Sequence, residues 1–184
     1  MYAGHLDLQQ PLVWTVDDAL DPTTCARYAS LIERGAEVAP VITERGVEVD
    51  LAVRSNTRVM WDDADEAAQL LTRVASTIPP TLAGKHLVGA NPRLRVYRYG
   101  VGERHGAHWD TVVELAGGVR SMLTLVFYLN DGFEGGATDF PELRRTIEPR
   151  RGRALVFQHR VLHEATVVTR GEKLVLRTDV LFRD

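Results

Sequence analysis

The chain of 184 residues has little of what marks several common protein classes. It contains one cysteine, which excludes an intramolecular disulfide, and its 22 Lys and Arg are outnumbered by 25 Asp and Glu. No overall positive charge therefore draws it to nucleic acid or to an anionic membrane. No apolar run approaches the ~20 residues that span a bilayer, and the first residues lack a secretory pattern. We expect a cytoplasmic protein with neither nucleic-acid nor membrane partners.

The first half of the chain is expected to form a support of helices and a hairpin, over about residues 1–90. Asp21 before Pro22 is typical of a helix start, and apolar residues at helical spacing, Cys25 among them, predict a helix over 23–34 with Cys25 packed inside. Further elements are a β-hairpin over 41–53, a strand ending at 59–61, and a second helix from Asp62 or Asp63 to about Ser76.

From Asn91 the pattern changes to short strands separated by Gly, Pro, Asn or Asp. Eight strands are predicted, over 94–99, 105–110, 121–129, 137–140, 145–148, 154–157, 163–168 and 173–182. Strands at this spacing indicate a double-stranded β-helix, the jelly-roll core of cupin-like proteins. The fold class expected is therefore mainly β with N-terminal helices, in a single domain over 1–184 whose jelly-roll core spans about 91–184.

Three residues form a candidate metal site. His108 and Asp110 share a face of an extended strand, and His163 opens a later strand. Two imidazoles and one carboxylate on one face of an octahedron leave three positions open, as in non-haem Fe(II) oxygenases. Trp109 points the other way by parity and is expected in the core. The remaining histidines, His5, His86 and His159, are read as ordinary surface or core residues.

A cation follows on the last strand. Lys173 lies ten residues after His163, and Arg177 shares its face by strand parity. A buried ammonium or guanidinium needs an anionic partner. Either or both could therefore bind a dicarboxylate. The Arg-rich stretch of residues 144–153 is read as a solvated hairpin.

At this point the sequence resembles a known family. The matching segments, in order along 95–183, are Tyr97-Arg98-Tyr99-Gly100-Val101-Gly102, His108-Trp109-Asp110, Leu125-Val126-Phe127-Tyr128-Leu129-Asn130, Gly135-Gly136-Ala137-Thr138-Asp139-Phe140, and His163 through Gly171-Glu172-Lys173. They cover about half of the chain. This pattern resembles the 2-oxoglutarate/Fe(II)-dependent oxygenases, in their prolyl 4-hydroxylase-like branch.

The resemblance implies cofactors and roles. Fe(II) would be held by His108, Asp110 and His163, with 2-oxoglutarate and dioxygen as co-substrates and ascorbate as an optional further cofactor. Lys173 would bind the distal carboxylate of 2-oxoglutarate, and Tyr99 falls where family members often hydrogen-bond the same group. One departure concerns the substrate: three residues before the first iron ligand, where many prolyl hydroxylases carry an aromatic residue, this chain has His105.

The resulting hypothesis is a 2-oxoglutarate-dependent dioxygenase that hydroxylates an unactivated C–H bond and releases succinate and CO2. Its substrate is expected to be a peptide, an amino acid or a small metabolite. Two alternatives stay open: a cupin-like divalent-metal enzyme that does not use 2-oxoglutarate, and a non-catalytic jelly-roll binding module. The segments 100–107 and 111–118 flank the metal ligands as candidate lids, in which Arg104, His105 and Glu114 are expected to affect coupling. Arg93, Arg95 and Arg120 are candidates for an anion-attracting entrance.

Overall fold

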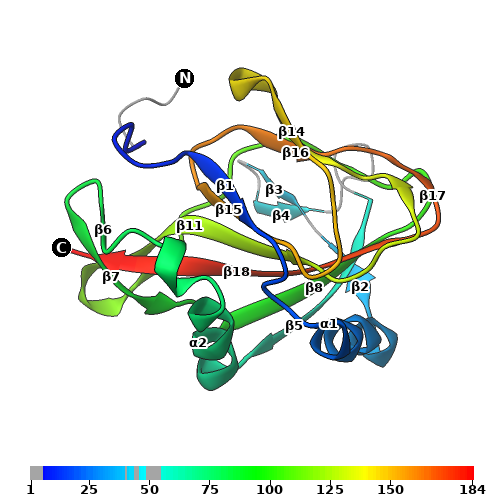
Figure 1. The fold of residues 1–184 in the computed structure, drawn as a ribbon, viewed down its shortest axis with the longest axis horizontal. Coiled ribbons are helices and arrows are strands. Elements are labelled where there is room, and N and C mark those ends of the chain that lie inside the picture. The colour runs from blue at the N-terminus through cyan, green and yellow to red at the C-terminus, as the bar shows by residue number, and fades with distance from the viewer. Residues whose placement is uncertain (1–5, 40, 44–45, 49–54) are drawn as a thin grey trace.

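The computed structural model describes residues 6–39, 41–43, 46–48 and 55–184, and shows two β-sheets stacked face to face (Figure 1). Within these residues the larger sheet contains β1 (Val13–Val16), β2 (Glu37–Val38), β5 (Thr57–Asp62), β6 (Thr81–Leu82), β7 (Lys85–Ala90), β8 (Arg93–Tyr99), β10 (Glu114–Leu115), β11 (Val119–Tyr128), β15 (Ala154–Gln158) and β18 (Lys173–Arg183). The smaller sheet contains β9 (His105–His108), β13 (Thr138–Phe140), β14 (Arg145–Ile147) and β16 (His163–Ala165).

The pairing order produces the double-stranded β-helix. The main path of the larger sheet runs β1-β15-β11-β18-β8-β5-β2, and the smaller sheet runs β14-β13-β16-β9. Two short ladders complete the described strands: β12 (Glu134–Gly135) pairs with β17 (Val168–Arg170), and β3 (Val41–Thr43) pairs with β4 (Gly46–Glu48). The predicted fold class, mainly β with a jelly-roll core, is confirmed.

The two α-helices lie beneath the larger sheet, on the side away from β14 and β16 (Figure 1). Helix α1 (Pro22–Ala29) begins as predicted: the Asp21 side chain accepts a hydrogen bond from the backbone N–H of Thr24. Helix α2 (Ala64–Thr72) is capped in the same way by Asp63. Both are shorter than predicted: α1 is followed by a 3₁₀ helix over Ser30–Arg34, and α2 by one over Ala75–Thr77. The other 3₁₀ helices among the described residues, Ala116–Gly118 and Pro141–Leu143, lie between strands.

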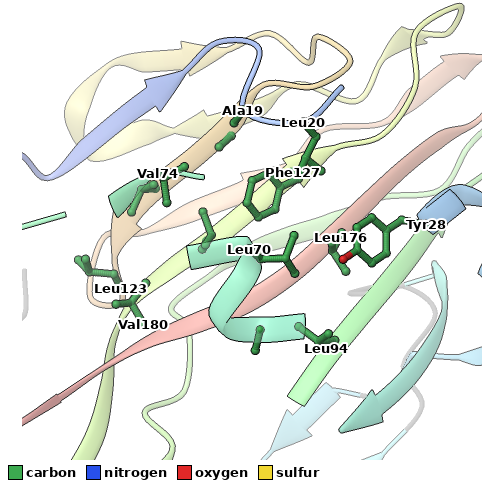
Figure 2. Close-up of a cluster of buried hydrophobic side chains, with 14 of the residues drawn as sticks. Ala19, Leu20, Tyr28, Leu70, Val74, Leu94, Leu123, Phe127, Leu176 and Val180 are labelled. Atoms are coloured by element: carbon green, nitrogen blue, oxygen red, sulfur yellow. The ribbon is translucent and has the colours of Figure 1, made fainter. Parts of the chain in front are cut away.

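Strand parity divides the side chains of the larger sheet between two cores. Figure 2 shows Leu70 of α2 and the nearby Val74 packing on one face of the sheet, against Leu94, Phe127 and Leu176. The alternate residues of the same strands point into the space between the two sheets, where a second buried cluster includes Tyr97, Tyr128, Leu155, Phe157 and Val175. The helices therefore seal one face of the sheet and leave the other to form a site.

Several expectations need correction or lie outside the description. The strand predicted to end at 59–61 is present as β5, but the N-terminal half also contributes β1 and β7, which were not predicted, to the larger sheet. The strand predicted over 163–168 is two strands, β16 and β17. The hairpin predicted over 41–53 is present as β3 and β4, but residues 44–45 and 49–53 lie outside the described residues, as does His5.

The expected location of Trp109 is wrong, because its side chain is 41% exposed. Strand β9 ends at His108. Trp109 therefore lies beyond the ladder, with its side chain partly exposed to solvent and not in a core. The prediction for Cys25 is confirmed, since its thiol is fully buried. Among the described residues no helix is long and apolar enough to cross a bilayer.

Candidate metal centre

The three predicted metal ligands meet in the inter-sheet space. Strands β16 and β9 pair antiparallel with His163 directly opposite His108, and Asp110 follows two residues after β9. One possible ligand atom from each residue lies within 4.8 Å of the others. The Nε2 atoms of His108 and His163 lie 3.8 and 3.7 Å from the two carboxylate oxygens of Asp110. Three donors this close could hold one divalent ion on one face of an octahedron.

The backbone fixes which nitrogen each histidine presents. The Nδ1 of His108 lies 2.7 Å from the carbonyl oxygen of Gly106, and the Nδ1 of His163 lies 3.0 Å from that of Val161. Each Nδ1–H can therefore donate to a carbonyl, which leaves Nε2 without a proton and directed at Asp110. This arrangement, a ligand nitrogen oriented through a hydrogen bond from the other ring nitrogen, is usual for metal-binding histidines.

The protonation states also fit a metal. Burial, with a contribution from the neighbouring His163, lowers the pKa of His108 to about 3, and burial lowers the pKa of His163 as well. Burial alone would raise the pKa of Asp110, but the charge of Arg177 and the two imidazoles outweigh it and hold that pKa well below its usual range. Near neutral pH the site therefore offers two neutral imidazoles and one carboxylate, the forms that bind cations.

Two further side chains fix the carboxylate of Asp110. Arg177 contacts its Oδ1 at 2.8 Å, and the hydroxyl of Thr124 donates to its Oδ2 at 2.5 Å. Arg177 is held in turn by Asp179 at 3.2 Å. Asp179 also contacts Arg95 at 3.5 Å. The two carboxylates outweigh desolvation and raise the pKa of Arg177, so its charge is fully compensated within the protein.

A cavity extends from the triad along β18 between the sheets. His108, His163 and Arg177 line it at the metal end, and Lys173 lines its far end. Lys173 and Arg177 are four residues apart on one strand, which separates their backbones by about 13 Å. The sequence could not distinguish these cations, but the structure assigns them different surroundings.

The ammonium of Lys173 has no carboxylate partner within 4.0 Å among the described residues, although its side chain is only 2% exposed. Its Nζ donates to the carbonyl oxygen of Gly136 and lies 5.2 and 5.5 Å from the ring centroids of Tyr99 and Tyr128. Burial lowers its pKa to about 7. A buried ammonium surrounded by aromatic rings and one carbonyl is under-compensated, which is the environment expected where an anion is to bind.

Several residues of this cavity carried no predicted role. Tyr128 and Thr138 share a hydrogen bond of 2.8 Å beside Lys173, and Thr124 and Asp179 orient the metal end. The sequence contained a signal for Asp179 and Thr124, because each is a polar residue at a buried position of a strand, and Asp179 shares its face of β18 with Lys173 and Arg177. His105 lines the cavity and stacks on His108, with ring centroids 3.6 Å apart.

The predicted entrance arginines do not act together. Arg93 is paired with Asp62 at 2.8 Å and Arg95 with Asp179, and neither lines the cavity at the triad or a second cavity beside it. Arg120 borders the second of these. His86 is exposed, whereas His159 is buried beside Asp179. In the Arg-rich stretch, Arg150 and Arg153 pair with Asp17, as a solvated segment would.

The fold and the triad define a double-stranded β-helix with a site suited to a divalent metal. A model of the 2OG-Fe(II) oxygenase superfamily matches residues 94–178. The chain is 31% identical over 100 residues to a putative prolyl 4-hydroxylase of Acanthamoeba polyphaga mimivirus, covering 45% of this chain and 41% of that protein. It is 36% identical over 76 residues to the bovine prolyl 4-hydroxylase subunit alpha-1, covering 37% and 14%.

Solved structures of other proteins are similar in fold to this chain over nearly its whole length. A viral collagen prolyl hydroxylase from Paramecium bursaria Chlorella virus-1 superposes with a TM-score of 0.67 at 18% identity, covering 96% of this chain and 98% of that one. A prolyl-4-hydroxylase from Pseudomonas putida gives a TM-score of 0.66 at 20% identity, covering 97% and 96%. At these identities the likeness establishes the shared fold.

Residues 94–178 are thus similar to the 2OG-Fe(II) oxygenase superfamily, and the relatives support a 2-oxoglutarate/Fe(II) oxygenase of the prolyl 4-hydroxylase-like branch. The chain spans less than half the length of the curated relatives that it matches. The family implies Fe(II), 2-oxoglutarate and dioxygen as cofactor and co-substrates.

Proposed function

We propose that this chain is an Fe(II)- and 2-oxoglutarate-dependent dioxygenase that hydroxylates an unactivated C–H bond of a peptide, an amino acid or a small metabolite. The observation that carries the proposal is the pairing of two features in one cavity. A triad suited to a divalent cation lies at one end, and the under-compensated ammonium of Lys173 lies at the other. A dicarboxylate that chelates a metal with one end and pairs its other end with a cation matches both.

Each residue has a proposed part. His108, Asp110 and His163 would hold Fe(II), whose chemistry with dioxygen and 2-oxoglutarate yields succinate, CO2 and one hydroxyl group on the substrate. Lys173 would anchor the distal carboxylate of 2-oxoglutarate. Tyr99 lies close enough to Lys173 to contribute to the same subsite.

Arg177 was a candidate for the same anchor, and its contacts support a different part. Its guanidinium is already paired with Asp110 and Asp179, so we propose that it orients Asp110 and faces the metal end of 2-oxoglutarate. Thr124 fixes the second oxygen of Asp110, so that the carboxylate presents itself to the metal in one orientation. Such supporting contacts are worth tenfold or more in metal affinity in other sites.

The substrate would enter at the metal end. His105 is the residue of the cavity most directly placed to touch it, because it stacks on His108 and lines the same space. Because the relatives include prolyl hydroxylases, a prolyl residue is the first probe. Free amino acids and small metabolites are the others.

The test is succinate release by the Fe(II)-loaded protein, measured with and without ascorbate across peptides, amino acids and metabolites, with product masses determined. Succinate formed in equal amount to a product 16 Da heavier than the substrate supports the proposal. The independent check is calorimetric binding of 2-oxoglutarate to the Co(II)-loaded protein. If 2-oxoglutarate does not bind, a metal enzyme that does not use it becomes the better hypothesis.

A further inference from the structure

A second cavity, of about 400 Å³, lies beside the metal centre and carries charges that the proposed reaction does not use. Its charged lining comes from four places in the chain: Lys85 at the start of β7, Glu114 in β10, Arg120 in β11, and Arg160 in the loop after β15. The volume is in the range of sites that bind small molecules. It is therefore large enough to be a binding site in its own right.

Three short chain segments contribute lining residues to both cavities. These are residues 108–112, 122–124 and 160–163, each with one end lining each cavity. At about 3.3 Å per residue, none of these spans exceeds about 13 Å. Asp110 lies in the first of them, and its backbone N–H donates to the carbonyl oxygen of His159, which lines the second cavity. The second cavity is therefore separated from the triad by no more than about 13 Å of chain.

The lining favours an anion. It contains three cations, Lys85, Arg120 and Arg160, against the single carboxylate of Glu114. The carboxylates that now contact Arg120 and Lys85, those of Glu114 at 3.1 Å and of Asp184, are 69% and 78% exposed. Exposed ion pairs of this kind are weak, so a ligand's carboxylate could displace them. A guanidinium also binds a carboxylate through two parallel hydrogen bonds.

We propose that this cavity is a substrate subsite that receives a free carboxylate, with Arg120 as a main contact. The inference rests on the proposed function, because it makes the substrate of that reaction a carboxylate-bearing small molecule. A free amino acid and the carboxyl-terminal residue of a peptide both present this group. A carboxylate held there would lie near the backbone of Asp110, and the rest of the substrate would have to reach from this cavity past Asp110 to the metal end.

The experiment compares matched acids and amides. Binding of free amino acids, their N-acetyl derivatives and the corresponding amides to the Co(II)- and 2-oxoglutarate-loaded protein is measured by ligand-observed NMR, beginning with proline, leucine and lysine. The acids are expected to bind about tenfold more tightly than the amides, because only they offer a charge-assisted contact to the cations. Binding of both free and N-acetylated acids points to a peptide carboxyl terminus, and binding of free acids alone points to an amino acid.

Three variants test the assignment to this cavity. Arg120→Gln is expected to weaken acid binding about three- to tenfold, since Arg120 is partly exposed and its contact is screened. Glu114→Gln removes the competing carboxylate and is expected to leave acid binding unchanged or tighter. Arg93→Gln is the matched control, because Arg93 pairs with Asp62 outside both cavities.

Weaker acid binding by Arg120→Gln, without weaker binding by Glu114→Gln or Arg93→Gln, separates a local contact from a general change of charge. Equal binding of acids and amides, or no binding of any acid at millimolar concentration, overturns the inference, as does an Arg120→Gln variant that behaves like Arg93→Gln. Failure of the unaltered protein to bind 2-oxoglutarate counts instead against the proposed function. In that case the acid–amide comparison is repeated without 2-oxoglutarate, and it still tests whether the second cavity binds a carboxylate.

Discussion

Replacing Lys173 by Met should weaken 2-oxoglutarate binding while making the ligand-free protein more stable. The ammonium of Lys173 is buried without a carboxylate partner within 4.0 Å among the described residues, and burial lowers its pKa from 10.5 to about 7. At about 1.4 kcal/mol for each tenfold change in proton affinity, keeping this charge costs the fold up to about 5 kcal/mol. Methionine fills a similar volume and carries no charge. The variant should therefore have a higher Tm.

The cost of burying the Lys173 ammonium depends on pH in a defined direction. Because the pKa of Lys173 is lower in the folded chain than in the unfolded chain, the unfolded chain binds the proton more tightly. The destabilisation is complete below about pH 7 and disappears as the pH rises toward 10.5. The gain in Tm from Lys173→Met should thus be largest near pH 6 and small near pH 10.

The same substitution removes the anchor for the distal carboxylate. A charge-assisted hydrogen bond contributes about 1.5–3 kcal/mol, so the Kd for 2-oxoglutarate should rise by roughly 10- to 150-fold. At pH 8 the ligand-free protein holds Lys173 mostly neutral, and binding should take up close to one proton. Calorimetry in two buffers of different ionisation enthalpy measures this uptake, which Lys173→Met should abolish.

Arg98→Met is the control, since Arg98 lies on the adjacent strand β8 and pairs with the exposed Glu172 at 2.7 Å. It removes a positive charge without touching the cavity, and neither the Kd for 2-oxoglutarate nor the proton uptake should change. A Lys173→Met protein that is less stable than the parent and binds 2-oxoglutarate normally would refute the reasoning. Lys173 would then be a structural residue.

Three other substitutions test the remaining parts of the site. His163→Ala should abolish turnover and weaken Co(II) binding, measured by calorimetry, with little change in the circular dichroism spectrum; retained 2-oxoglutarate decarboxylation would contradict the triad. Gly136→Ala should raise the Kd for 2-oxoglutarate, because an added Cβ would come within 3.0 Å of the Lys173 side chain at a backbone φ of +67°; unchanged affinity would argue against this subsite. Arg177→Met should weaken Co(II) binding about tenfold through loss of the contact to Asp110, whereas an effect confined to 2-oxoglutarate would make Arg177 the anchor.

Strand parity explains why much of the site could be predicted from the sequence. His108 and Asp110 were expected to point together, and Lys173 was expected on the same face as Arg177. These expectations depend only on the alternation of side chains along an extended chain. The positions of His163 and Lys173 within the motifs of the family predicted the third metal ligand and the cation.

Strand parity could not predict which partners surround each side chain in the folded protein. Lys173 and Arg177 are equivalent by alternation, yet one faces Tyr99 and Tyr128 and the other faces two carboxylates. One partner of Arg177, Asp179, lies on the same face of the same strand, whereas the other, Asp110, comes from elsewhere in the chain. Long-range pairing of this kind is set by packing between strands, which no local pattern encodes.

The misplacement of Trp109 has the same origin. Alternation predicted that it points away from the metal ligands, but whether the opposite face of a strand is buried depends on which element covers it. The helices cover the larger sheet, as Figure 1 shows, and β9 belongs to the smaller one. The outer side of β9 is left toward solvent.

The distribution of charge in the first cavity is itself an argument about what fills it. Arg177 is compensated by Asp110 and Asp179, so the protein alone stabilises that charge. Lys173 is not compensated to the same degree, and a chain that needed only to fold would gain from an apolar residue there. A ligand that binds only the folded state offsets such a cost by an amount that grows with the logarithm of its concentration relative to its Kd. The uncompensated ammonium therefore marks where the distal anion should bind, and its separation from the triad along β18 sets the length of molecule that can bridge the two.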